Sequence, residues 1–289
     1  MTDRFKTHFE NNEANSSQSA LLELMTLLGK YRQHLYLVGG WAPYYLLKLF
    51  QPKNDPFEHV GSIDIDLVID GKNISENQYA SLVDLIKQRG YSERKNRMGA
   101  PIPFSFEKNI NGLRVVVDFL AGEYGGTSKN HRHQIIEDDF LARKARGADL
   151  LPEHHLAFKL EGFLPEGARQ TCDIKMTNVV SLLAMKGITI SERYKEKDAY
   201  DIYSILAHYK QGATSCLEEI APHVKNGLIR EGLVSICDKF LLKDSVGPTW
   251  AAKFIAPENQ TEASLRQVEI YHQTYPFVQG IKKLLREGK

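Results

Sequence analysis

The segment Ser62–Ile69, with the sequence SIDIDLVI, constrains the fold more than any other part of the chain. Its strict alternation of apolar and polar residues predicts a β-strand with two different faces. Because side chains alternate with a period of two along a strand, Asp64 and Asp66 share one face, and the isoleucine and leucine side chains take the other. Two ionised carboxylates side by side repel each other unless a cation lies between them. The pattern therefore predicts either a metal site or two acids that face water on a half-exposed strand.

A third acid, Asp118, interrupts the apolar run Leu113–Leu120. A carboxylate within such a strand is costly to bury unless it is paired or bound to a metal. Three aspartates on neighbouring strands would form an all-oxygen site, which suits Mg²⁺. An ion pair with Arg114 or another base is the alternative interpretation of Asp118.

The dipeptide Gly39-Gly40 follows a short apolar segment, His34–Val38, and precedes a predicted helix over Trp41–Phe50. A glycine-rich turn between a strand and a helix lets backbone amides approach a phosphate closely, and the helix N-terminus favours an anion. An ordinary tight turn would use the same dipeptide, so this motif gains its meaning from the aspartates that follow it.

Hydrophobic periodicity predicts an α/β (α+β) fold class: an N-terminal domain with a small mixed sheet and flanking helices, followed by a C-terminal helical bundle. Asn111-Gly112 between two apolar runs predicts a hairpin. The other predicted elements are helices at 21–30 and 76–89, strands at 102–107 and 113–120, and helices at 176–189, 196–209, 215–222, 227–241 and 260–286. The expected organisation is a loose polar N-terminus over 1–19, an α/β domain over 20–172 and a helical domain over 173–289.

In the helical half, charged residues interrupt two apolar stripes. Lys186 lies within the stripe of the 176–189 helix, and Asp198 lies within that of the next helix, with Asp201 on its flank. Charged groups on inward faces are rarely left unpaired. The residues are therefore either a buried ion pair that joins two helices or the lining of a cleft that faces the sheet, where Lys186 could contact a nucleotide phosphate.

Composition excludes several classes of protein. Lys plus Arg (37) nearly cancels Asp plus Glu (36), so any anion-binding site must be local. The longest apolar runs fall far short of the ~20 residues that a membrane span needs, and the polar N-terminus lacks the apolar core of a signal peptide. The three cysteines form neither a disulfide framework nor a CxxC metal site. We expect a cytoplasmic protein.

The order of these motifs resembles the nucleotidyltransferase superfamily that DNA polymerase beta typifies: Gly39-Gly40 at a strand-to-helix turn, then Asp-x-Asp, then an isolated Asp on a later strand. Residues 182–206 resemble the Lys-x6-Arg-x3-Lys-Asp-x2-Asp segment of the AbiEii/AbiGii-type abortive-infection toxins, which share that fold. The matching positions are Lys186, Arg193, Lys197, Asp198 and Asp201. The resemblance covers roughly residues 35–210 and, more loosely, the tail Gly247–Ile255. Two positions depart from the family pattern: Val60 stands where an Arg is common, and Trp41 stands where a Ser or Thr could bond a phosphate.

The resemblance implies a metal-dependent nucleotidyltransferase that moves a nucleoside monophosphate from an NTP to an acceptor hydroxyl and releases pyrophosphate. It implies that Asp64, Asp66 and Asp118 hold Mg²⁺ in a two-metal site and are catalytic together with Lys186 and Asp198. The implied nucleotide-binding residues are Gly39, Gly40, Ser62, Lys186, Arg193 and Asp201.

The resemblance does not identify the acceptor. RNA, in particular the 3′ end of tRNA, is one candidate; a small molecule such as an antibiotic, or a protein hydroxyl, is another. A toxin role would imply a cognate antitoxin. The basic clusters Arg94-Lys95-Arg97 and Arg143-Lys144-Arg146 could hold an RNA backbone or a triphosphate, or could be solvated faces. A degenerate, non-catalytic nucleotide-binding module is the alternative, and Val60 and Trp41 are its best support.

Overall fold

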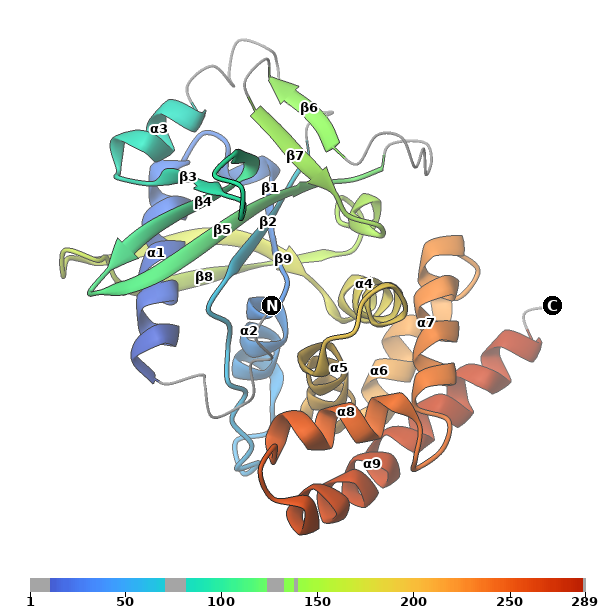
Figure 1. Cartoon of the computed structure of the whole chain (residues 1–289). Helices are drawn as coiled ribbons and strands as arrows, with labels where there is room; N and C mark the ends of the chain where they lie inside the picture. The colour runs from blue at the N-terminus through green and yellow to red at the C-terminus, as the bar shows by residue number, and fades with distance from the viewer. Residues whose placement is uncertain (1–10, 71–81, 124–132, 138–139, 288–289) are drawn as a thin grey trace. The chain divides into compact units, whose positions relative to one another are not determined.

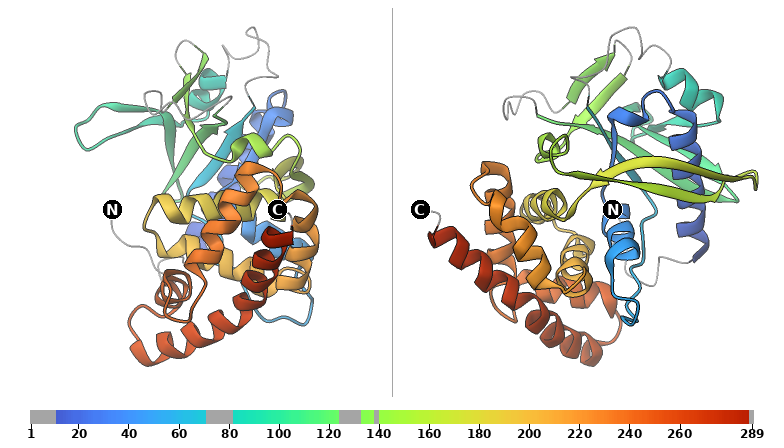
Figure 2. Two further views of the ribbon diagram at one scale, coloured as in Figure 1. Left: turned by 90° about the vertical axis from the view of Figure 1, so that its right-hand side faces the viewer. Right: turned by 180° about the vertical axis from the view of Figure 1, so that it is seen from behind.

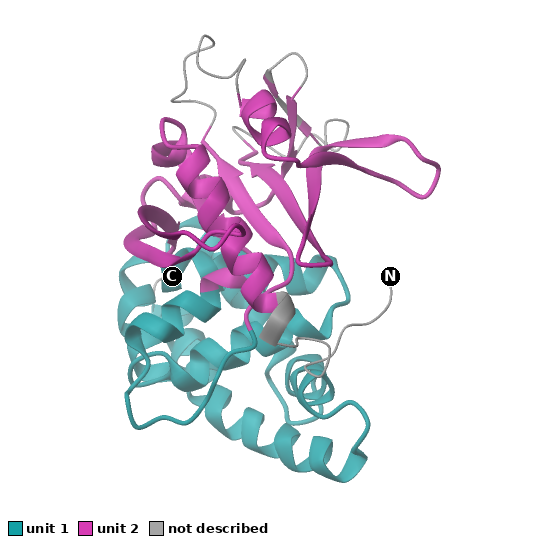
Figure 3. Ribbon diagram, turned by 90° about the vertical axis from the view of Figure 1, so that its left-hand side faces the viewer, with its two compact units in different colours: residues 1–9, 43–60, 178–289 teal, residues 10–42, 61–177 magenta. Residues whose placement is uncertain are grey.

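The computed structural model describes residues 11–70, 82–123, 133–137 and 140–287. The chain divides into two compact units (Figure 3). Among the described residues, the α/β unit comprises those of 11–42 and 61–177, and the helical unit comprises those of 43–60 and 178–287. The predicted fold class is confirmed: a mixed sheet with helices precedes a run of helices.

The described part of the α/β unit is built on one mixed sheet (Figure 1). Its main path has the order β3-β4-β5-β2-β1-β9-β8, and β7 pairs with both β5 and β6. The pairs β1–β9, β2–β5 and β5–β7 are parallel, and the others are antiparallel. The strands are β1 (Leu35–Val38), β2 (Ile65–Ile69), β3 (Ser92–Lys95), β4 (Pro101–Ile110), β5 (Leu113–Ala121), β6 (His133–Glu137), β7 (Phe140–Lys144), β8 (His155–Phe163) and β9 (Arg169–Thr177).

The two faces of this sheet differ in character. On one, the core face, the rings of Phe106, Phe119 and Phe140 pack against one another. Helix α1 (Asn11–Leu27) lies on the core face, behind the sheet in Figure 1, and contacts β5, β8 and β9. Its Glu23 carboxylate accepts bonds of 2.8 Å from Lys108 Nζ and 3.0 Å from the Tyr91 hydroxyl. The opposite face of β2 and β5, the aspartate face, carries the acids that the sequence singled out.

The described helices of the helical unit pack mainly in pairs. Helix α4 packs against α7, α5 against α8, and α8 and α6 against α9. The helices are α4 (Val179–Glu192), α5 (Glu196–His208), α6 (Ala213–Ile220), α7 (Gly227–Lys239), α8 (Val246–Ile255) and α9 (Gln260–Glu287). Asn178 caps α4 by accepting backbone N–H bonds from Val180 and Ser181, both at 3.1 Å. Such a cap fixes where the helix begins.

Residues 43–60 belong to the helical unit and pack on α5. They include most of α2 (Trp41–Phe50) and the loop that follows it. The Phe57 ring stacks on the ring of His208, with 3.9 Å between centroids, and Asp55 Oδ2 lies 2.7 Å from His208 Nδ1. The loop that leads into β2 is therefore fixed by contacts with a helix far along the sequence.

Most elements match their predicted positions. The strand at 34–38, the helix at 41–50, the Asn111-Gly112 hairpin and five C-terminal helices are confirmed. Helix α1 begins at Asn11, so residues 11–19 are helical rather than a loose lead-in. Strand β2 begins at Ile65, three residues later than expected. Helix α3 (Leu82–Gln88) covers the second half of the predicted 76–89 helix; residues 76–81 lie outside the described residues.

The long hairpin β8–β9 is the main element that sequence reasoning missed. Figure 2 shows its two strands running side by side, with register partners from His155 and Thr177 to Phe163 and Arg169. Apolar residues do alternate in β8. The turn between the strands contains Pro165 and Gly167, and the φ angle of Gly167 is +91°. Pro165 is part of the turn that joins the two strands, a position where proline is common.

Candidate active site

Asp66 and Asp118 are neighbours across the parallel strands β2 and β5. They are register partners, and so their half-buried side chains leave the sheet on the same face. Ser105, the partner of Asp118 on β4, donates a hydrogen bond of 2.5 Å from its Oγ to Asp118 Oδ1. Because Ser105 is only 1% exposed, this bond holds one oxygen of Asp118 in a fixed position.

Gly39 lies against the Asp66 carboxylate. Val38 is the register partner of Asp66 on the antiparallel pair β1–β2, so the glycine turn begins beside the acid. A Cβ atom at Gly39 would overlap the Asp66 carboxylate, with Cγ only 2.9 Å away, and its φ of +69° is one that other residues rarely adopt. Only glycine fits here without displacing the acid. The Gly39-Gly40 turn and the aspartates thus form one local arrangement.

Asp64 and Ser62 lie just before β2, so the strand periodicity that the sequence suggested applies to Asp66 but not to Asp64. Asp64 is half-buried and Ser62 is 8% exposed. Within the described ranges, no group of three His, Cys, Asp or Glu side chains is gathered as a metal cluster. The donor set of Asp66 and Asp118 is nevertheless all carboxylate oxygen, which fits a hard cation such as Mg²⁺.

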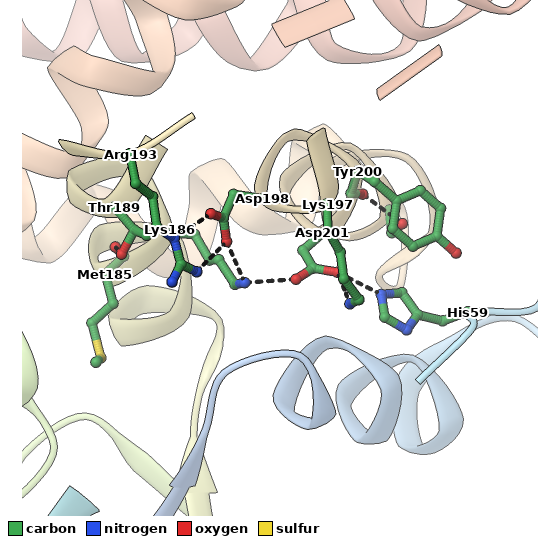
Figure 4. Close-up of polar contacts among 10 residues, drawn as sticks. His59, Met185, Lys186, Thr189, Arg193, Lys197, Asp198, Tyr200 and Asp201 are labelled. Atoms are coloured by element: carbon green, nitrogen blue, oxygen red, sulfur yellow. Dashed lines mark hydrogen bonds and ion pairs between the residues drawn. The ribbon is translucent and has the colours of Figure 1, made fainter. Parts of the chain in front are cut away.

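A buried ion network joins α4 to α5 in the helical unit (Figure 4). Lys186 Nζ donates to Asp198 Oδ1 at 2.9 Å and to Asp201 Oδ2 at 2.6 Å. Asp198 and Asp201 are 2% and 0% exposed. Lys186 and Asp198 are thus paired, as the ion-pair interpretation of the two apolar stripes predicts.

Three further side chains complete the network. Arg193 binds Asp198 through two nitrogens, with Nε–Oδ2 at 2.7 Å and Nη2–Oδ1 at 3.0 Å. Lys197 Nζ donates to Asp201 Oδ1 at 2.8 Å, and His59 Nε2 lies 3.1 Å from the same oxygen. The network therefore unites every charged position of the Lys-x6-Arg-x3-Lys-Asp-x2-Asp segment.

Burial and charge act against each other on the pKa values of this network. Burial alone would raise the pKa of Asp198, but Lys186 and Arg193 lower it to about 2. Burial would also raise the pKa of Asp201, but the charges of Lys186 and Lys197 outweigh that effect. The pKa of Asp201 therefore falls well below its ordinary value. Burial would lower the pKa of Lys186, yet the two aspartates raise it above the ordinary value. These three groups are therefore charged at neutral pH.

His59 behaves differently from its neighbours. Burial lowers its pKa to about 4, and the hydrogen bond to Asp201 only partly opposes this. His59 is therefore neutral near pH 7, and because a carboxylate can only accept, its Nε2 carries the proton and donates to Asp201.

Sequence reasoning missed Ser105 and His59. Ser105 sits between two phenylalanines, and His59 lies in a loop with no recognisable motif. Seven of the predicted residues form two sets: Gly39, Asp66 and Asp118 come together in the α/β unit, and Lys186, Arg193, Asp198 and Asp201 come together in the helical unit. The sequence could have revealed Ser105 only through the register of β4 on β5.

None of the described helices has the length and apolar character needed to cross a membrane. No curated protein matches the chain at a significant level. One family model does match, over residues 22–268, and it describes the nucleotidyl transferase AbiEii toxin of type IV toxin–antitoxin systems. That match covers all the motifs described above and most of both units. The chain therefore belongs to the AbiEii family of nucleotidyl transferase toxins.

Proposed function

We propose that this protein is a toxin that transfers a nucleoside monophosphate from an NTP to a hydroxyl of an RNA acceptor, with tRNA as the candidate. Membership of the AbiEii family supports the transferase chemistry. The observation that carries the proposal is the placement of Asp66 beside both Asp118 and Gly39. Because NTPs and tRNA are cytoplasmic, the reaction would take place in the cytoplasm.

The residues of the aspartate face have distinct roles in this proposal. Asp64, Asp66 and Asp118 would hold Mg²⁺, which when bound neutralises charge on the phosphates and on the departing pyrophosphate. The backbone amides of Gly39-Gly40 and the N-terminus of α2 would receive the phosphates of the NTP. Asp118 would accept the proton of the acceptor hydroxyl, whose oxygen then attacks the α-phosphorus while the bond to pyrophosphate breaks.

The ion network would serve the anionic substrates. Lys186, Arg193 and Lys197 contact the two carboxylates, Asp198 and Asp201. The Arg193 side chain is also 42% exposed, so its guanidinium group is accessible to a phosphate. We therefore retain Lys186 and Asp198 as catalytic candidates, and Ser62, Lys186, Arg193 and Asp201 as nucleotide-binding candidates.

Nucleotidyl transfer can be tested directly. The purified protein would be incubated with Mg²⁺, total RNA and each NTP labelled at the α-phosphate. We expect label in RNA, and a loss of about 10²-fold or more in Asp66→Asn and Asp118→Asn, because charge stabilisation of this kind is worth that much. Asp173→Asn, at an exposed position of β9, is the matched control and should keep full activity.

The acceptor fractions decide between the alternatives. Label in protein or in small molecules, with none in RNA, would redirect the proposal to those acceptors. NTP binding without label in any fraction would favour a non-catalytic module. Suppression of the activity by the product of an adjacent small gene would identify a cognate antitoxin.

A further inference from the structure

The loop that joins α4 to α5 presents an aromatic ring to solvent beside the ion network. Tyr194 is 86% exposed. Its ring centroid lies 5.6 Å from that of Trp250 on α8, and the two ring planes meet at 70°. In an edge-to-face pair at least one ring keeps both faces out of the contact. A tyrosine this exposed adds little to the core, so the pair offers flat apolar surface to a ligand.

Contacts on both sides hold this loop in place. Arg193 ends α4, where its backbone N–H donates to the Thr189 carbonyl at 3.1 Å, and its side chain is bonded to Asp198. Lys253, one turn after Trp250, donates to Glu196 at 2.7 Å and so ties α8 to the start of α5. A ligand that binds here meets an ordered surface and therefore incurs little cost for ordering it.

Three cationic residues, Arg193, Lys195 and Lys253, flank the two rings in the chain. Tyr194 lies between Arg193 and Lys195 in the chain, and the side chains of Arg193 and Lys253 are 42% and 49% exposed. Two of these cations are also paired with acids, Arg193 with Asp198 and Lys253 with Glu196 at the start of α5, and the exposed Glu192 precedes Arg193. Flat rings flanked by cations match a ligand that combines phosphates with unpaired bases.

We propose that the Tyr194–Trp250 surface, formed by these two residues with Lys195 and Lys253, binds single-stranded RNA, with an unpaired base stacked on Tyr194. The inference rests on the proposed function, because the RNA is the acceptor strand, and it extends that function by placing a contact for the acceptor on the helical unit. A double helix would satisfy the cations but hides the faces of its bases, and an acidic peptide offers nothing to stack.

Tryptophan fluorescence can locate the contact. The chain has two tryptophans, and Trp41 is only 1% exposed. We expect a short oligouridylate, added without NTP or Mg²⁺, to change the fluorescence of the full-length protein, and Trp250→Phe to abolish that change. A change that persists in Trp250→Phe would contradict the inference.

Affinity provides the second measurement, read from the anisotropy of labelled oligouridylate. Tyr194→Ala should weaken binding about tenfold or more, whereas Tyr194→Phe should retain it, because stacking needs the ring and not the hydroxyl. Lys195→Ala should make the slope of log affinity against log salt concentration shallower, by the amount expected for about one phosphate contact. Equal affinities for wild type and Tyr194→Ala, or polyglutamate that competes as well as RNA does, would overturn the inference.

The binding assay is independent of catalysis, so the two proposals can fail separately. Asp66→Asn should bind oligouridylate as wild type does. Binding that depends on Tyr194, without any transfer of label to RNA, would refute the proposed function alone. Transfer to RNA that is unaffected by Tyr194→Ala, together with unchanged affinity, would refute only the present inference.

Discussion

At the scale of single residues, the most demanding feature is the burial of charge around Asp201. Two carboxylates and an ammonium group are almost wholly removed from water, and their mutual contacts must compensate for lost hydration. Such a network is stable when complete and costly when one member is missing. Its members should therefore affect folding as well as activity.

Lys186→Met should lower the free energy of unfolding by about 3–5 kcal/mol, because it leaves Asp198 and Asp201 buried beside fewer cations. Chemical denaturation monitored by circular dichroism would measure this. Lys243→Met is the control: its ammonium group lies 3.7 Å from Asp244 on an exposed surface, so the change should be under about 0.5 kcal/mol. A loss of activity in Lys186→Met without any loss of stability would show that the lysine acts on substrate alone.

His59 should make stability depend on pH between 6.5 and 4. Its folded pKa, about 4, lies below the ordinary 6.5, so in this window the unfolded chain binds the additional proton. Stability is therefore complete above pH 6.5 and falls by about 3 kcal/mol as the pH drops to 4. Asp198 and Asp201 stay ionised in the folded protein across this window.

The measurement is the free energy of unfolding at several pH values for wild type and for His59→Asn, which cannot titrate there. The variant should be less stable at pH 7 and should show a flatter pH dependence. Parallel curves for the two proteins would contradict the assignment of this slope to His59.

The sequence patterns identified most residues of the candidate site but not the residues that hydrogen-bond to them. Strand and helix periodicity singled out Asp66, Asp118, Lys186 and Asp198, because a charge within an apolar pattern is visible locally. Ser105 and His59 escaped because their partners lie 13 and 142 residues away in the chain. Their role follows from strand register and helix packing, which a single sequence does not contain.

At the scale of elements, α4 and α7 cross with their backbones in contact at Gly187 and Gly232. A Cβ at Gly232 would lie 2.7 Å from Ala184 Cα, and one at Gly187 would overlap the backbone of Gly232. Glycine is unfavourable within a helix, so its presence at this crossing reflects the space available.

Gly232→Ala should therefore destabilise the protein by about 1–3 kcal/mol, since the helices must separate to admit the methyl group. Gly227→Ala, in the first turn of the same helix with open space around it, should be neutral or slightly stabilising. Thermal unfolding of both variants beside wild type tests the pair. If Gly232→Ala unfolds at the temperature of Gly227→Ala, the crossing is less tightly packed than described.

Elements with strong local signals were predictable, and those that depend on context were not. Helix α8 was not among the predicted elements, and its first turn contains Gly247 and Pro248, two residues that usually favour a break. Pro248 is the third residue of the helix, where a backbone N–H has no partner within the helix and a proline is tolerated. The predicted start of helix α1 was too late because the first residues of the helix are polar, and polar composition alone does not exclude a helix.

At the scale of the whole molecule, the helical unit is discontinuous in sequence. Residues 43–60 complete it through the stacking of Phe57 on His208, the His59–Asp201 contact and a bond of 3.3 Å from the Val60 N–H to the Tyr200 hydroxyl. No sequence pattern indicated this partnership, because the loop is short and polar in places and its partners lie on α5.

A fragment of residues 178–289 should therefore fold poorly by itself, with a broad, low-temperature melt, since α5 would expose Tyr200 and leave Asp201 without His59. Adding a synthetic peptide of residues 43–60 should sharpen the melt and raise its midpoint. A peptide in which alanine replaces Phe57 and His59 is the control. A fragment that melts sharply without any peptide would show that the helices are self-sufficient.

Because the helical unit is discontinuous in sequence, its parts become available for folding at different times during translation. Residues 43–60 leave the ribosome more than a hundred codons before α5, and contacts between such distant segments form late. A nascent chain halted before α5 therefore lacks Asp198 and Asp201, the partners of Lys186 and His59. If the ion network is needed for transfer, as we propose, a product truncated before α5 should be unable to modify the acceptor.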